Sequence, residues 1–177
     1  MTAAVLAGCG REEIKVYTVP KDITEASAQV APPPPISWKT PSTWVQINPT
    51  PLRVGNFTIT EGDLKAEMAI IPFPGQVGGE LENVNRWRGE IGLRPVNEGE
   101  YSSETVQIGS VSGKLFELEG EKQATLAAML EKEGTSWFFK MRGDKALVAQ
   151  NKPVLIEFLK SIQFEAAKAH AAQSNAS

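Results

Sequence analysis

The sequence predicts an α+β fold, in which an antiparallel sheet of about six to seven strands carries helices on its faces. Three observations lead to this prediction. Short runs of alternating apolar and polar residues fill most of the chain, and glycine-containing turns separate them. One segment with helical spacing interrupts these runs, and a second follows the last of them. Because short turns join neighbouring strands, the strands pair antiparallel, and the helices are left to cover the faces of the sheet.

Length and composition indicate one globular domain with a tail at each end. The chain has 177 residues, of which 41% are hydrophobic and 22% charged, and a chain of this size can bury a core without disulfides. The net charge of −3 argues against a nucleic-acid partner, which requires a concentrated basic surface. We divide the chain into a truncated signal at 1–9, a proline-rich tether at 10–35, a domain at 36–164 and a disordered tail at 165–177.

The first nine residues carry a cysteine motif. Residues 5–9 read Val-Leu-Ala-Gly-Cys, and Cys9 is the only cysteine of the chain. The motif resembles the lipobox of bacterial lipoproteins, which implies cleavage before Cys9, a lipid on its thiol, and a domain in the cell envelope facing the periplasm or the exterior. A complete signal peptide has a basic start and an apolar stretch, so we expect the true signal to begin upstream. The alternative is a cytosolic protein whose N-terminus matches by chance.

The tether at 10–35 is polar and ends in four consecutive prolines, Pro32 to Pro35. A proline run favours the extended polyproline II helix and acts as a stiff spacer. As a flexible chain, a tether of this length spans roughly 30 Å, which would hold a domain just clear of a membrane surface. An SH3-type ligand is the alternative for the proline run, and Ile14 to Val19 is a candidate short strand.

Three short strands are expected before the central helix. Alternation slips at Gly55, so we predict a β-bulge there in the second strand. The turn at 61–63 contains a glycine and pairs the second strand with the third. In the third strand every other residue is expected to face the core. The expected strands are Trp44 to Ile47, Leu52 to Thr60 and Leu64 to Ile71.

A glycine-rich loop and an amphipathic helix follow, between Phe73 and Leu93. Glu80 and Glu82 suit the positive end of the helix dipole, and Gly92 can end a helix of about three turns. The loop glycines lack the spacing of a P-loop or a dinucleotide motif. We therefore interpret the loop as a tight turn with positive φ rather than a phosphate site. The apolar helix face consists of Leu81, Val84, Trp87 and Ile91.

Four more strands and then helical sequence complete the domain. Ala124 to Glu131 has helical propensity, but tight turns on both sides favour a strand. A short helix is expected at 145–150, and Asn151 is expected to cap a separate helix with Pro153 in its first turn. The apolar stripe of that helix is Val154, Leu155, Phe158, Leu159 and Ile162. The expected strands are Thr105 to Ile108, Val111 to Glu119, Ala124 to Glu131 and Ser136 to Arg142.

Several of these features together resemble a known fold family. A tryptophan lies near the start of the domain, a helix in its middle, Trp-Phe-Phe-Lys-Met-Arg-Gly at 137–143 and Phe-Leu-Lys-Ser-Ile-Gln-Phe at 158–164. This arrangement is similar to the PsbP-like and DcrB-like sandwich proteins over residues 36–164. The resemblance implies a non-enzymatic accessory or assembly protein, secreted or lipid-anchored, and supplies no catalytic residue.

The residue types that common catalytic sites need are missing from the domain. The only histidine, His170, lies in the tail, and the only cysteine is Cys9. Ser-His-Asp and Cys-His sites and a zinc site are therefore excluded within 36–164. We expect no enzymatic activity, no cofactor and no metal.

Two groups of carboxylates are the remaining candidates for a site. We interpret both as solvated strand ends, and a weak calcium site is the alternative. The two groups are Glu98, Glu100 and Glu104, and Glu117, Glu119 and Glu121.

The polar side of the central helix is the candidate interaction face, made of Asn83, Asn85, Arg86 and Arg88. Arginine and aromatic side chains concentrate binding energy at interfaces, and Trp87 lies beside them. The alternative is a core tryptophan with solvated neighbours.

Two functions follow as hypotheses. The first is a non-catalytic lipoprotein, attached to the membrane through its N-terminal lipid, that binds or helps to assemble an envelope protein. The second is a carrier of a small apolar ligand, in a pocket between sheet and helix lined by Trp38, Trp44 or Trp137.

Overall fold

The computed structural model describes residues 36–165, so Cys9, the proline-rich tether and the tail from residue 166 lie outside the described residues. The described range folds into two sheets and two helices. The helices are α1 (Glu80–Glu90) and α2 (Lys145–Lys160). The strands are β1 (Ile36–Ser37), β2 (Val45–Gln46), β3 (Gly55–Glu61), β4 (Leu64–Pro74), β5 (Glu104–Ile108), β6 (Val111–Glu119), β7 (Gln123–Lys132), β8 (Thr135–Asp144) and β9 (Gln163–Phe164).

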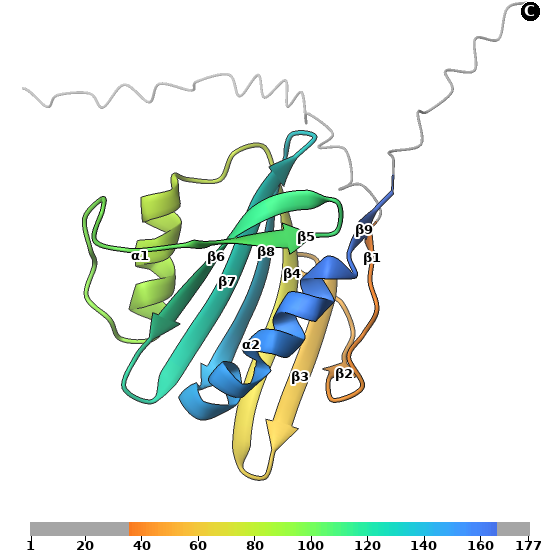
Figure 1. Cartoon of the computed structure of the whole chain (residues 1–177), viewed down its shortest axis with the longest axis horizontal. Helices are drawn as coiled ribbons and strands as arrows, with labels where there is room; N and C mark the ends of the chain where they lie inside the picture. The colour runs from red at the N-terminus through yellow and green to blue at the C-terminus, as the bar shows by residue number, and fades with distance from the viewer. Residues whose placement is uncertain (1–35, 166–177) are drawn as a thin grey trace, which may run out of the picture.

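The main sheet has seven antiparallel strands in the order β2-β3-β4-β8-β7-β6-β5. The sheet is strongly curved, with α2 running across one face and α1 packed on the other (Figure 1). A second sheet pairs β1 with β9 and brings the two ends of the domain together. The α+β prediction, with a largely antiparallel sheet between helices, is confirmed.

Each face of the sheet has its own core, and β8 contributes to both. Trp137, Phe139 and Met141 pack in the larger core beneath α2, as their alternate spacing predicts. Phe138 points to the opposite face and packs with Trp87 of α1 in the smaller core. A central strand covered on both sides accounts for the continuous apolar run in this part of the sequence.

Strand β4 is longer than the predicted strand Leu64 to Ile71, because it continues through two prolines to Pro74. The Val54 N–H donates to the Ile70 carbonyl at 3.0 Å, and β3 begins there, so β4 beyond Ile70 pairs only with β8. In a strand, the backbone N–H and C=O groups of every second residue point to the same side. The Ile70 carbonyl points toward β3, so the backbone nitrogens of Pro72 and Pro74 face the side on which β3 no longer runs. Proline is tolerated at such an edge because no donor is needed there.

The predicted bulge at Gly55 is wrong. Pairing between β3 and β4 runs in regular register from Gly55 opposite Ile70 to Glu61 opposite Leu64. A Cβ atom at Gly55 would lie 2.6 Å from Ile70 Cδ1 and 3.2 Å from the ring of Trp38. Close packing of these two side chains over the backbone therefore explains the glycine.

The prediction of two C-terminal helices with an N-cap at Asn151 is also wrong. A single helix, α2, runs through this position and contains Pro153. Asn151 is buried; its amide nitrogen donates to the Leu147 carbonyl at 2.9 Å, and its oxygen accepts from Trp44 Nε1 at 3.0 Å. Since apolar residues on both sides of Pro153 pack in the same core, tertiary contacts hold the helix together across the proline.

Strand rather than helix is confirmed for residues 124–131. They belong to β7, which pairs with β6 on one side and β8 on the other. Glu133 and Gly134 form the two-residue turn to β8, both with positive φ, at 52° and 71°. Such turns match the twist of paired strands, so pairing on both sides overrides the helical propensity of Ala124–Glu131.

Candidate functional site

The glycine-rich loop before α1 is fixed to the turn between β7 and β8. Gly75 and Gly78 have positive φ, at 77° and 66°, which confirms the predicted turn. The Gly75 N–H donates to the Gly134 carbonyl at 2.7 Å, and the Ser136 hydroxyl donates to the Gly75 carbonyl at 2.7 Å. The loop therefore has a defined shape against the sheet.

Side chains of α1 close the other end of the loop. The Glu82 carboxylate accepts from the Gly79 N–H at 2.9 Å, which satisfies one of the donors left at the start of a helix. The Asn83 amide donates to the carbonyls of Val77 and Gly79, at 2.9 and 3.0 Å. Because the first turn of α1 also carries Glu80, two carboxylates lie where a bound anion would have to sit.

A groove of about 790 Å³ separates this loop from the sheet. The helix α1 covers only part of the sheet face on which it packs, and the groove occupies the part of that face next to the start of the helix. Its lining combines apolar, hydroxyl-bearing and charged side chains. The lining residues are Gln76, Val77, Gly78, Gly79, Glu80, Thr105, Ser112, Gly113, Lys114, Met129, Leu130, Glu131 and Ser136.

The polar groups of the groove are paired across it. Lys114 on β6 forms an ion pair with Glu80 on α1, and Gln76 Nε2 donates to Glu131 at 3.0 Å. The hydrogen bond to Glu80, with its negative charge, raises the pKa of Lys114. Desolvation, followed by the charge of Glu80, raises the pKa of Tyr101 nearby. These pairs join the loop and helix to the strands, so both walls of the groove are held in place.

Sequence reasoning identified the loop but missed the wall formed by β5 to β8. One signal was present in β6. On the face turned to α1, Phe116 and Leu118 are apolar and buried, whereas Ser112 and Lys114 are polar and exposed. This change along one strand indicates that the helix covers only half of the face.

Asn83 is not part of an exposed face, and the expectation that it is exposed is wrong. It is only 2% exposed, and its amide binds the loop carbonyls described above. Helical spacing alone placed it on the polar side, but the loop folds back over the first turn of α1 and covers it. Asn83 is a positioning residue for the glycine-rich loop.

The other three residues of the predicted face also bind their own chain. Asn85 pairs with the backbone of Val96 in both directions, at 2.9 and 2.8 Å. Arg88 Nε donates to the Arg94 carbonyl at 2.8 Å. Arg86 is exposed; it donates to Asn83 Oδ1 at 2.7 Å and lies over the ring of Phe138. Of the four, Arg86 alone is exposed.

Trp87 is a core residue. It is 1% exposed, and its ring lies 5.7 Å from that of Phe116 and 5.9 Å from that of Phe138, measured between centroids. This cluster attaches α1 to the sheet, so the position of the groove wall depends on it.

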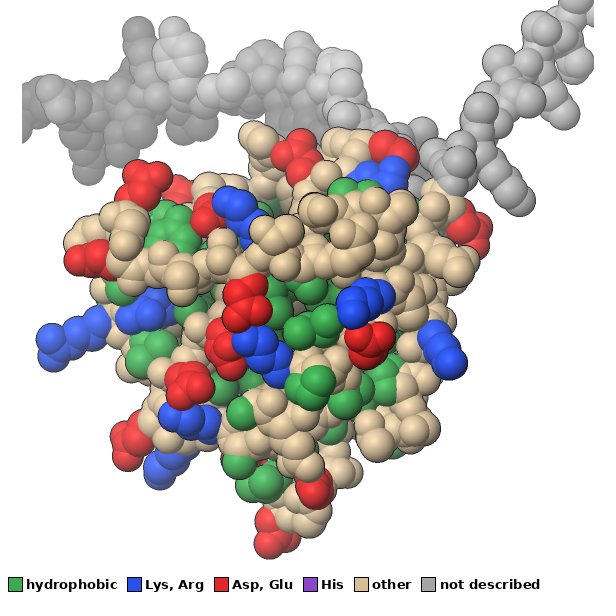
Figure 2. All heavy atoms as spheres, viewed as in Figure 1, with side chains coloured by type: hydrophobic (Ala, Val, Ile, Leu, Met, Phe, Trp, Pro, Cys, Tyr) green, Lys and Arg blue, Asp and Glu red, His purple; other side chains and the backbone are tan. Residues whose placement is uncertain are grey.

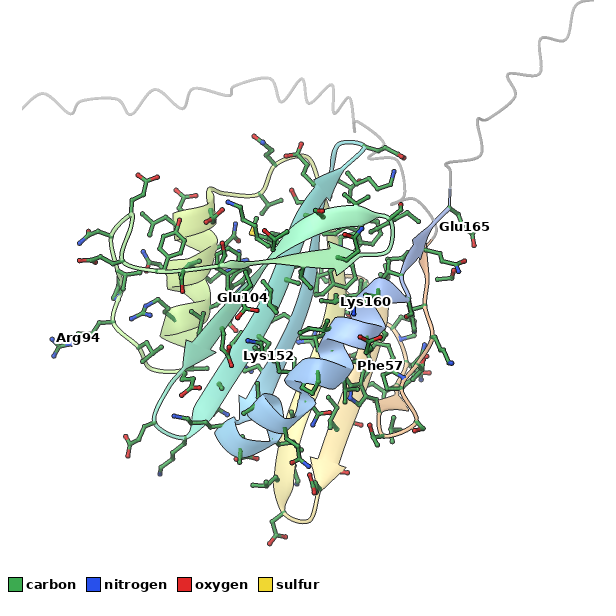
Figure 3. All side chains as sticks on the ribbon, in the orientation of Figure 1. Phe57, Arg94, Glu104, Lys152, Lys160 and Glu165 are labelled. Atoms are coloured by element: carbon green, nitrogen blue, oxygen red, sulfur yellow. The ribbon has the colours of Figure 1, made fainter. Side chains whose placement is uncertain are left out.

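The carboxylates at the other face are paired with lysines. Lys152 of α2 points toward Glu104 of β5 (Figure 3) and donates to it at 2.9 Å and to Glu117 at 2.7 Å. Hydrogen bonds to these two carboxylates raise the pKa of Lys152. Basic and acidic side chains alternate across the centre of this face (Figure 2). Within residues 36–165, no group of three or more His, Cys, Asp or Glu side chains is placed to hold a metal ion.

The tryptophans expected to line a carrier pocket pack against other aromatic rings. Trp44 lies 5.1 Å from Phe158, and Trp137 lies 5.3 Å from Phe164, between ring centroids. Trp38 contacts the ring of Phe57 edge-on at 6.0 Å. Trp44 and Trp137 are buried in the filled core beneath α2, which counts against a carrier with a cavity at this place.

The only histidine, His170, and the predicted lipid attachment site, Cys9, lie outside the described residues. Within the part of the chain that the structure describes, neither helix combines the length and apolar character needed to cross a bilayer.

No family model and no curated protein matches the chain. Among solved structures, a protein of Bacteroides thetaiotaomicron VPI-5482 is similar, with a TM-score of 0.44 and 15% identity over 74% of this chain and 45% of that protein. LpqN of Mycobacterium tuberculosis, described as involved in cell envelope biogenesis, gives a TM-score of 0.46 and 13% identity over 75% of this chain and 84% of LpqN. The chain thus spans less than half of the Bacteroides protein. At these scores neither likeness bears on ligand or partner.

Proposed function

We propose that this chain is a non-catalytic binding module of the bacterial cell envelope, held at a membrane by a lipid on Cys9. Its partner is another envelope protein, which it binds or helps to assemble. The partner docks in the groove between the glycine-rich loop and strands β5 to β8. The observation that carries the proposal is this groove of about 790 Å³, which lies beside the start of α1.

The composition of the groove favours recognition of a protein surface. Val77 and Met129 offer apolar contact, while Glu80 and Lys114 provide charges of both signs. Interfaces combine apolar contact with a few placed polar groups in this way. Hydrogen bonds from Gly75 and Asn83 fix the loop, so a partner would meet a preformed surface, which lowers the cost of binding.

Anchoring is supported by the sequence before the domain. The motif Val-Leu-Ala-Gly-Cys at 5–9 and the polar, proline-rich stretch that follows suit a lipid attachment point and a spacer. A lipid on Cys9 would hold the groove within reach of other membrane-bound proteins, where a modest affinity is raised by high effective concentration.

Replacing Cys9 by alanine is expected to release the protein from the membrane fraction. The gene is expressed in its host with its natural upstream sequence, and membrane and soluble fractions are compared by immunoblot. Mass spectrometry of the N-terminal peptide is expected to show a diacylglycerol thioether in the wild type only. An unmodified Cys9 in a wild-type protein recovered from the soluble fraction would refute the anchor.

A photo-crosslinking residue at Ser112 is expected to join the protein to a discrete envelope partner in living cells. Ser112 is exposed and lines the groove. The matched control carries the same residue at Gln150, which is exposed on α2 at the opposite face. The adduct should form at 112, not at 150, and should disappear when Thr105→Trp fills the groove. Equal adducts at both positions, or none at 112, would contradict docking in the groove.

A further inference from the structure

Within residues 36–165, the exposed large apolar side chains all lie in one short segment. Val45, Ile47 and Leu52 are 61%, 41% and 66% exposed. Val45 belongs to β2, the edge strand beside β3 (Figure 1). Single exposed apolar residues are common on proteins, but several on one segment form a candidate contact surface.

The backbone presents this segment in a fixed conformation. Thr50 and Arg53 exchange two backbone hydrogen bonds, at 3.0 and 3.2 Å, and the Thr50 hydroxyl accepts a third from the Arg53 N–H at 3.2 Å. This tight turn places Leu52 near its tip. Ile47 is held to β3 by its N–H, which donates to the Asn56 carbonyl at 2.9 Å. The exposed residues are thus displayed by an ordered turn and strand.

The charge pattern of the segment differs from that of the rest of the domain. From Thr40 to Leu52 there is no charged residue, and the segment is bracketed by two cations, Lys39 and Arg53. Every Asp and Glu of residues 36–165 follows Arg53. Arg53 also lies 3.5 Å from the Glu67 carboxylate of β4, so the segment has one acidic neighbour at this end. Apolar side chains flanked by cations, in a stretch that carries no carboxylate of its own, complement the surface of a bilayer that contains anionic lipids.

Pairing with a strand of another protein is a poor alternative for this surface. β2 has only two residues, and so short an edge offers few backbone groups for an added strand. The side chains, rather than the backbone edge, are what this segment presents.

We propose that Val45, Ile47 and Leu52 dock the domain onto the lipid bilayer to which the chain is anchored. The inference rests on the proposed lipid at Cys9, which attaches the chain to the membrane. The described domain begins at Ile36, only nine residues before Val45, so the anchored end of the chain leads directly into this segment. As a flexible chain, a tether of about 26 residues has a root-mean-square end-to-end distance of roughly 30 Å. Contact of the patch with the same membrane is then intramolecular and needs little affinity of its own. Docking orients the domain relative to the membrane.

The test attaches the full chain to vesicles through its only cysteine. The Cys9 thiol is coupled to maleimide-bearing phosphatidylethanolamine in vesicles of phosphatidylcholine and phosphatidylglycerol whose acyl chains are brominated. The reporter is Leu52→Trp, measured as bromine quenching above the wild-type background. The matched control is Arg94→Trp, an exposed position on the opposite side of the domain from Phe57 and β3 (Figure 3). Coupling replaces natural lipidation, so the result does not depend on the Cys9→Ala experiment.

Quenching of L52W and little quenching of R94W are expected. Adding Val45→Glu and Ile47→Glu to L52W removes two apolar contacts and adds two carboxylates, which should weaken docking by about tenfold or more and return the signal to that of R94W. Near-UV circular dichroism checks that these surface variants remain folded. Equal signals from L52W and R94W would overturn the proposal. The proposal would also be overturned if L52W stayed unquenched and light scattering showed a dimer that Leu52→Glu dissociates. The exposed residues would then bind a second copy of this chain.

Discussion

Replacing Trp87 by alanine is expected to lower the free energy of unfolding by about 3–5 kcal/mol. The side chain is 1% exposed and fills the core between α1 and the sheet, where its ring contacts those of Phe116 and Phe138. The substitution therefore combines lost burial with a cavity.

The loss of stability in Trp87→Ala should affect α1 and the groove most. The helix has 11 residues, and a helix of this length is marginal without tertiary contacts. Its detachment would carry the glycine-rich loop away from the sheet. Urea denaturation followed by fluorescence and circular dichroism measures the change. Arg86→Ala is the control on the same helix, with an expected change within about 0.5–1 kcal/mol because the side chain is exposed. A loss below about 1 kcal/mol for Trp87→Ala would contradict this account of the smaller core.

Replacing Gly143 by alanine is expected to cost about 3 kcal/mol or more, or to prevent folding. Gly143 lies in β8, opposite Ala66 of β4, and both strands are central in the sheet. An added Cβ would overlap the Lys65 carbonyl oxygen and the Cα of Ala66, and would lie 2.6 Å from the Cβ of Ala66. Two of these three atoms are backbone atoms of a strand hydrogen-bonded on both sides, so they cannot move aside cheaply.

Gly89→Ala is the matched control for this prediction and should change stability in the opposite direction. Gly89 lies within α1, and a Cβ there would meet no atom within 4 Å. Alanine is more favourable than glycine by roughly 0.5–1 kcal/mol in a helix interior, and Gly89 lies in the last turn of α1, so a gain at the lower end of this range is expected. Both variants are measured by the same urea titration. Equal stability of Gly143→Ala and the wild type would show that β4 and β8 are not packed as closely as described.

Apolar periodicity predicted the elements of this fold well where one face of an element is buried. Leu81, Val84 and Trp87 recur at helical steps, and α1 forms there with Val84 and Trp87 buried. Alternation in residues 136–142 predicted the strand, and its alternate residues Trp137, Phe139 and Met141 lie in the larger core. These patterns are local, because the spacing of side chains on a helix or strand is set by the backbone itself.

Polar residues with long-range partners were the ones that sequence reasoning misplaced. Asn151 looked like a helix cap, but it is buried in mid-helix because Trp44, 107 residues earlier, donates a hydrogen bond to it. Asn83 looked exposed, but the glycine-rich loop folds over it. A local pattern cannot distinguish a capping or solvated asparagine from one bonded to a distant group, since both occupy polar positions.

By itself, the sequence determined the α+β class, the central helix with its apolar face, the tight turns and most of the strands. Only the tertiary structure decided the strand order, the continuation of β4 through its two prolines, and the groove beside α1. The physical reason is that these features depend on contacts between residues far apart in the chain. Lys114 meets Glu80, 34 residues away, only after β6 and α1 have packed on the same face of the sheet.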